Sequence, residues 1–116
     1  HLSIGKGTSI GEMNNIRAGG GTIRIGEKCI LAQHISIVAA NHLIAPGEFM
    51  IDQAWDTTKN FIVIEDDVWI GTNATILDGV ILAKGCIIGA NSVVTKSTEP
   101  YKVYGGIPAK CIGKRD

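Results

Sequence analysis

Aliphatic side chains recur at every sixth position through the second half of this sequence. The unbroken run is Ile64, Ile70, Ile76, Leu82, Ile88 and Val94. A period of six fits neither an α-helix, which repeats every 3.6 residues, nor a strand, which repeats every two. It is typical of a solenoid in which each hexapeptide forms one side of a triangular coil, so that about eighteen residues complete one turn.

A smaller residue follows each aliphatic residue after four positions and predicts a second, tighter inward-facing site. These smaller residues are Val68, Ala74, Val80, Cys86 and Ser92. Glycine and asparagine lie between them, and both tolerate the backbone conformations that sharp corners require. Stacked coils would pair their strands in parallel, about 4.8 Å apart. The predicted fold is therefore an all-β parallel helix of about four coils.

The same period runs through the first half with two interruptions. Two sets are in step, Ile4, Ile10 and Ile16, and then Ile25, Leu31, Ile37 and Leu43. The longer step between these sets predicts that extra residues bulge out within 17–24. Residues 44–61 show no six-residue signal, and we expect them to form a loop that leaves one corner of the prism. Long loops inside compact domains are usually functional.

The ends of the chain give further expectations. Residues 109–115 are expected to form a short tail or helical stub packed by Ile112. The chain begins with His1 rather than Met, inside a repeat. We therefore expect that an N-terminal segment has been removed, or that His1 belongs to a tag.

Length, charge and cysteine content limit the classes of function. The chain has 116 residues, which predicts one domain over residues 1–116. Its zero net charge argues against nucleic acid or an anionic membrane as the main partner. No run of eighteen apolar residues is present, so we expect no membrane insertion. Cys29 and Cys86 fall in the small inward position, and no cysteine shows metal-ligand spacing, so we expect reduced core residues. Reduced cysteines suit a cytoplasmic location.

Three stretches carry a resemblance to a known family. They are residues 64–71 (IEDDVWIG), 89–96 (GANSVVTK) and 105–110 (GGIPAK). With the hexads, they resemble the hexapeptide-repeat acyltransferases, in particular the galactoside, maltose and polysaccharide O-acetyltransferase branch. The resemblance covers nearly the whole chain. It implies a left-handed parallel β-helix, acetyl-CoA as cosubstrate, and a homotrimer whose active sites lie between subunits.

His42 is the candidate catalytic residue. It directly precedes the predicted loop, so we expect it at a corner beside the loop's exit. An acceptor hydroxyl needs a base to remove its proton as it attacks a thioester, and histidine is suited to that role. The resemblance assigns this role to His42, and the alternative is an ordinary surface histidine at a turn. His34, at a corner of a plain hexad, is a weaker candidate.

The resemblance also implies where coenzyme A binds. In the family the pantetheine arm lies in a groove between two subunits, held largely by backbone groups at corners. Thr72 and Ala90 match those corner positions, and Trp69 would form a wall of the groove. The positions that approach the nucleotide phosphates correspond here to Thr95, Lys96 and Lys110. Where some relatives have a further arginine this sequence has Gly113, so Lys114 or Arg115 could replace that contact.

The acceptor is predicted from fewer residues. Asn41, and Asn14 or its neighbour Asn15, are the candidate acceptor-binding residues. The galactoside and maltose enzymes have an acidic, sugar-contacting residue where this sequence has the bend at 19–21, so neither sugar is favoured. We expect direct acetyl transfer to a sugar hydroxyl of a polysaccharide or lipid-linked glycan, with no metal required.

Two alternatives come from other functional classes. A gamma-class carbonic anhydrase shares the architecture but holds its metal with three histidines, and inside this fold only His34 and His42 are available. A non-catalytic β-helix scaffold would need neither His42 nor Trp69. A metal assay and a coenzyme A binding measurement separate these readings from an acyltransferase.

Overall fold

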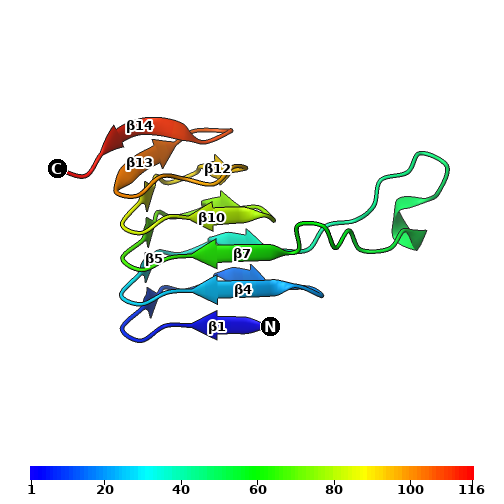
Figure 1. Ribbon diagram of the computed structural model, residues 1–116, viewed down its shortest axis with the longest axis horizontal. Coiled ribbons are helices and arrows are strands. Elements are labelled where there is room, and N and C mark those ends of the chain that lie inside the picture. The colour runs from blue at the N-terminus through cyan, green and yellow to red at the C-terminus, as the bar shows by residue number, and fades with distance from the viewer.

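Three parallel sheets form the walls of a triangular prism in the computed structural model, which describes residues 1–116 (Figure 1). Sheet A contains β1 (Leu2–Ile4), β4 (Thr22–Ile25), β7 (Phe61–Ile64) and β10 (Val80–Leu82). Sheet B contains β2 (Ser9–Ile10), β5 (Ile30–Leu31), β8 (Trp69–Ile70), β11 (Ile87–Ile88), β13 (Lys102–Gly105) and β14 (Lys110–Lys114). Sheet C contains β3 (Asn15–Arg17), β6 (Ser36–Val38), β9 (Thr75–Ile76) and β12 (Val93–Val94).

The chain visits sheets A, B and C in turn, so each set of three strands completes one coil. Four coils follow from β1 to β12, and equivalent strands of successive coils pair in parallel. The predicted left-handed parallel β-helix of about four coils is confirmed. We name the prism's edges by the sheets that meet there: the A–B, B–C and C–A edges.

The six-residue pattern defines the core. Every aliphatic side chain in the run from Ile64 to Val94 is at most 2% exposed, and so is every smaller residue that follows it. Cys29 and Cys86 occupy the predicted inward position as free thiols, and burial raises the pKa of both. A narrow prism therefore buries two side chains per hexad and turns the rest outward.

The first half of the chain follows the pattern less closely. Ile25, Leu31 and Ile37 are buried as predicted, but Leu43 is 47% exposed and lies outside the prism. The prediction for Leu43 is wrong because the chain has already left sheet C after Val38. The extra residues between the two sets form a tight turn, in which the Gly21 amide donates to the Ala18 carbonyl over 2.9 Å.

Corner residues adopt positive φ angles once in every hexad. In the second half they are Asp67, Asn73, Gly79, Gly85 and Asn91, with φ between 59° and 77°. These are residue types that tolerate the left-handed region. Earlier corners use Gly7 and Gly19, and also Met13, Lys28 and His34. His34 is therefore a corner residue of the wall, as its hexad position predicts.

The long loop leaves the prism between β6 and β7 and projects far to one side (Figure 1). It contains the chain's one helical turn, a 3-10 turn at Met50–Asp52, so no helix could cross a membrane. Because β7 begins at Phe61, the loop ends at Asn60, one residue earlier than the predicted boundary.

The C-terminus differs from the predicted tail or helical stub. Residues 110–114 form β14, which pairs antiparallel with β13 over the last coil (Figure 1). Ile112 is 69% exposed and does not pack the segment. The pairing satisfies the outer edge of β13, whose backbone groups would otherwise lack partners. This backbone requirement, rather than burial of an apolar side chain, determines the conformation.

Candidate functional site

A short antiparallel ladder at the base of the loop holds His42. The Leu43 amide donates to the Ala54 carbonyl over 3.0 Å, and the Asp56 amide donates to the Asn41 carbonyl over 2.8 Å. These bonds flank the bridge between His42 and Trp55 and make it a non-hydrogen-bonded pair. In such pairs the two facing side chains lie closest together. The register of the ladder therefore directs the His42 and Trp55 side chains at each other.

The two rings are stacked. Their centroids lie 4.5 Å apart, with an angle of 23° between the ring planes. Both side chains are exposed at the C–A edge of the prism. His42 thus presents an imidazole to solvent with one face covered by indole, beside the loop's exit as the sequence predicts. This arrangement leaves a histidine accessible to substrate while limiting its orientation.

Asn41 ties this part of the loop to the prism wall. Its Oδ1 accepts the His42 amide over 2.9 Å, and its Nδ2 donates to Asp78 Oδ2 over 3.4 Å. Asp78 follows β9, at the same edge in the next coil. The Asn41 side chain therefore supports the backbone of His42. The predicted contact of Asn41 with an acceptor stays a prediction.

Gln53 organises the inside of the loop. Its side chain is 6% exposed, although the residues around it are mostly accessible. Oε1 accepts the Ala45 amide over 2.8 Å, and Nε2 donates to the carbonyls of Ala45 and Glu48 over 2.9 and 3.2 Å. Neither Gln53 nor Trp55 was singled out from the sequence. Their only signals are an amide and an indole within a loop that has no periodicity.

The return of the chain from the loop base to β7 begins with a local turn. The hydroxyl and amide of Thr58 donate to Asp56 Oδ1 over 2.7 and 3.0 Å. These bonds hold the pKa of the Asp56 carboxyl below its usual value. The segment that carries Trp55 is therefore anchored on both sides, by Gln53 before Trp55 and by the Asp56–Thr58 turn after it.

A different edge carries the residues matched to the pantetheine arm. Thr72 and Ala90 lie on the B–C edge, where the Thr72 hydroxyl donates to the Gln33 carbonyl over 2.9 Å and the Asn91 amide donates to the Thr72 carbonyl over 2.9 Å. His34 is on this edge too, across the width of sheet C from His42. Within one chain the structure does not bring these groups to the histidine.

Asn14 also lies on the B–C edge and has a structural role. Its Nδ2 donates to the Ala32 and Gly11 carbonyls over 2.9 and 3.2 Å, and its Oδ1 accepts the Ile35 amide over 2.8 Å. The amide thereby joins the first coil to the second. Its predicted contact with an acceptor receives no support from this geometry.

Trp69 stands on the outer face of sheet B. It is half exposed and in register with neighbouring apolar residues of the same face, Ile30, Ile87 and Val103. A cavity of about 150 Å³ beside it is lined in part by Lys28 and Arg115. An exposed indole within an apolar row is suited to contact a ligand or another subunit.

The residues matched to the nucleotide phosphates lie in two separate places, the C–A edge and the C-terminal strand. Thr95 and Lys96 follow β12 on the C–A edge, two coils beyond the level of His42. Lys110 is exposed at the start of β14, opposite Gly105. Arg115 is already engaged: its Nη1 lies 2.9 Å from Asp67 Oδ2 and donates to the Gly85 carbonyl over 3.0 Å. It therefore holds the C-terminus to the wall.

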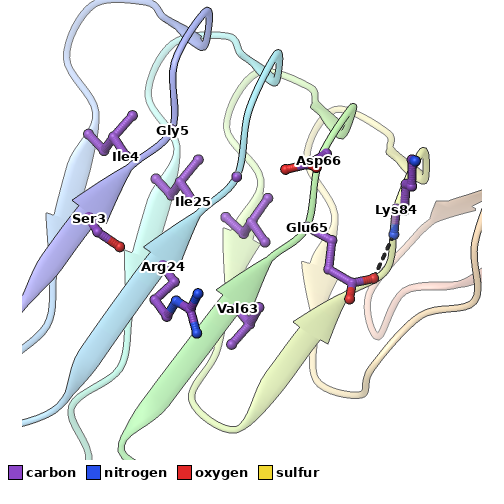
Figure 2. Close-up of a pocket in the computed structure, with 11 residues that line it drawn as sticks. Ser3, Ile4, Gly5, Arg24, Ile25, Val63, Glu65, Asp66 and Lys84 are labelled. Atoms are coloured by element: carbon purple, nitrogen blue, oxygen red, sulfur yellow. Dashed lines mark hydrogen bonds between the residues drawn. The ribbon is translucent and has the colours of Figure 1, made fainter.

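A large groove opens elsewhere, along sheet A near the A–B edge (Figure 2). Its volume is about 750 Å³, and Arg24, Glu65, Asp66 and Lys84 lie around it. Figure 2 shows the Glu65 carboxylate directed at the Lys84 backbone amide, 2.8 Å away. Asp66 accepts the Glu27 amide in the same way. Both carboxylates support corners, and none of the predicted site residues lines this groove.

The arrangement also bears on metal binding. No group of three histidine, cysteine, aspartate or glutamate side chains is placed to hold a metal ion within the chain. His34 and His42 lie on different edges. A carbonic-anhydrase-like centre would therefore have to be assembled from several copies.

Comparisons with known proteins agree with this architecture. The family model described as Bacterial transferase hexapeptide (six repeats) matches residues 61–96, the third and fourth coils. A protein of Lysinibacillus sphaericus described as a probable macrolide acetyltransferase is 41% identical over 111 residues, covering 83% of this chain and 62% of that protein. The chain is thus similar in sequence to hexapeptide-repeat acetyltransferases.

Solved structures extend the likeness to the whole chain. A hexapeptide-repeat-containing acetyltransferase of Vibrio cholerae is 30% identical with a TM-score of 0.86, covering 99% of this chain and 63% of that chain. That protein has also been solved in complex with acetyl coenzyme A. The polySia-specific acetyltransferase NeuO is 28% identical with a TM-score of 0.83, covering 97% of this chain and 51% of that one. This chain thus spans between about half and three fifths of the length of these three relatives.

Proposed function

We propose that this β-helix is the catalytic part of an acetyl-CoA-dependent O-acetyltransferase, with His42 as the general base. The observation that supports this most directly is the His42 imidazole, which is exposed at a prism edge yet held by the loop-base ladder. The complex of the Vibrio cholerae relative with acetyl coenzyme A supports the choice of cosubstrate.

The proposed reaction is a single direct transfer. His42 takes the proton of the acceptor hydroxyl as its oxygen attacks the thioester carbonyl carbon. A carbon–oxygen bond forms, the carbon–sulfur bond breaks, and the proton passes from the imidazolium to the departing coenzyme A sulfur. Removal of the hydroxyl proton during attack avoids a positively charged oxygen in the tetrahedral intermediate.

The acceptor we propose is a sugar hydroxyl of a glycan, in the cytoplasm. The polySia-specific relative supports a glycan. The Lysinibacillus sphaericus relative supports a second candidate, an antibiotic acceptor. Both are hydroxyl acceptors for the same base. The three free cysteines are compatible with a reducing compartment.

We further propose that the working form is a homotrimer with each site between two subunits. The residues assigned to the pantetheine arm lie on the B–C edge, whereas His42 lies on the C–A edge. Two copies placed side by side would bring these edges together, with Trp69, Thr72 and Ala90 from one copy beside His42 from the next.

Substitution of His42 tests the assignment of the base. His42→Ala should reduce turnover by roughly 10²–10⁴-fold, as is typical when a general acid–base group is lost. The melting temperature should be unchanged because the side chain is exposed. The matched control is His34→Ala, on the other edge of sheet C, which should retain activity. An inactive His34 variant beside an active His42 variant would reverse the assignment.

A mass-spectrometric screen identifies which acceptor the protein acetylates. Purified protein and acetyl-CoA are incubated with p-nitrophenyl glycosides, oligosialic acid, erythromycin and chloramphenicol, and each product is examined for the added mass of one acetyl group. Parallel reactions after treatment with a metal chelator, and a metal analysis of the protein, test the carbonic-anhydrase-like alternative. Failure to bind acetyl-CoA would favour the scaffold reading.

A further inference from the structure

The His42 imidazole makes no hydrogen bond within the chain. Its backbone is fixed by the ladder and by Asn41, and the aromatic ring stacked on it is the Trp55 indole. An exposed histidine without such a neighbour would exchange among its staggered rotamers. A base that acts in a transition state must occupy one of them, with the correct nitrogen facing the acceptor.

We propose that Trp55 is a positioning residue that holds the His42 ring in its working orientation. This proposal rests on the proposed role of His42 as the base. Trp55 acts through His42 and need not touch the reacting atoms. The stacked geometry leaves the ring edge of the imidazole, where its nitrogens lie, free for a hydroxyl group.

The loop is built to keep the indole in place. Trp55 faces His42 because the ladder register is set by the two backbone bonds that flank the pair. Before it, Gln53 fixes the chain through three hydrogen bonds, and after it the Asp56–Thr58 turn does so. A shift of one residue would move the indole to the opposite face of the ribbon.

An alternative role for Trp55 is burial of apolar surface inside the loop. The indole is 44% exposed, however, so much of its surface gains nothing from burial. The two roles make different predictions. If Trp55 serves the packing of the loop, leucine should replace it without loss of turnover. If it positions the imidazole, an aromatic ring is required.

The first measurement uses the free protein and needs no acceptor. The ring protons of His42 should be shifted upfield in the NMR spectrum by the indole ring current, relative to those of His34, which has no stacked partner. The shift should persist in Trp55→Phe and disappear in Trp55→Leu. An unshifted His42 in the wild-type protein would overturn the inference.

The second measurement is kinetic. Acetyl transfer from acetyl-CoA is followed with chloramphenicol or a p-nitrophenyl glycoside, whichever the mass-spectrometric screen shows to be acetylated. Trp55→Leu should lower kcat by roughly 10- to 100-fold, because a misplacement of about 1 Å can cost 10²-fold. The KM for acetyl-CoA should not change. Trp55→Phe should retain most of kcat.

Controls separate this inference from the proposed function. Phe49→Leu removes an exposed aromatic ring from the loop tip and should leave kcat unchanged. If His42→Ala remains active, the proposed function fails. If His42→Ala is inactive while Trp55→Leu keeps the wild-type kcat, the base stands and the positioning role is wrong. Equal melting temperatures show that the variants are folded, and the ring-current shift of His42 in the wild-type protein gives the test should the leucine variant unfold.

Discussion

At the scale of single residues, close approach between coils decides which side chains are tolerated. Gly21 ends the turn that leads into β4, and a Cβ atom there would lie 1.8 Å from the Asn60 carbonyl oxygen. That carbonyl accepts the Thr22 amide over 2.9 Å and closes the return of the long loop onto the prism. Gly21 is therefore required by space, independently of its φ angle.

Gly21→Ala should destabilise the protein by about 1–3 kcal/mol, the usual cost of forcing extra atoms into a packed site. The neighbouring Gly20 provides a matched control, since its Cβ would meet nothing within 4 Å. Gly20→Ala should be neutral or slightly stabilising. Urea unfolding of the two variants measures the difference. Equal stability would show that the Asn60 carbonyl moves aside at no cost.

Lys96 and Lys110 are exposed, so their proposed contacts with the phosphates of coenzyme A should be weak and screened by salt. Replacing both with alanine should raise the KM for acetyl-CoA by roughly two- to fivefold per lysine, as expected for about 0.5–1 kcal/mol per exposed contact. The effect should shrink at high salt, with kcat unchanged. Lys6→Ala is the control. A fall in kcat at constant KM would assign these lysines to the acceptor.

At the scale of elements, the hydrogen bonds of Gln53 give the loop a fixed shape. Gln53→Ala removes the hydrogen bonds of this side chain and leaves the Ala45 and Glu48 carbonyls without their donor. Amide hydrogen exchange across the loop should accelerate, while the coils keep their protection and the protein its melting temperature. Turnover should fall, because the loop holds Trp55 against His42.

The conservative variant Gln53→Glu refines this prediction. A carboxylate can still accept the Ala45 amide but cannot donate to the two carbonyls. Its loop should therefore also exchange faster than wild type. Loop exchange at the wild-type rate in both variants would mean that the ladder alone fixes the loop.

The difference between the periodic coils and the aperiodic loop explains what could be predicted from sequence. Burial imposes a six-residue period on every coil, so the core, the inward cysteines and the number of coils follow from the spacing of Ile70 and its equivalents. The loop pairs Ala45 with Gln53 and His42 with Trp55 through bonds that obey no period. The strand at β14 was missed because backbone pairing with β13, not side-chain burial, determines it.

At the scale of the whole molecule, the prism presents apolar side chains on its outer walls. Ile81 and Val63 are aligned on sheet A, and Ile30 and Trp69 on sheet B. Such surfaces commonly mark protein contacts. Sedimentation velocity should therefore show a trimer at working concentration. A stable monomer would contradict both the trimer and the proposed site between subunits.

The parallel pairing of the coils also fixes the distance between successive coils along the axis of the prism. Its pitch is the strand spacing of about 4.8 Å, which backbone hydrogen bonds set and side chains cannot alter. The level of Thr95 and Lys96 is two coils from the level of His42, and hence about 10 Å along the axis. That separation can change only by whole coils. A protein with this fold can change the conformation of its loop continuously. The axial distance between its catalytic histidine and the residues that contact the far end of a long cosubstrate changes only by multiples of the coil spacing.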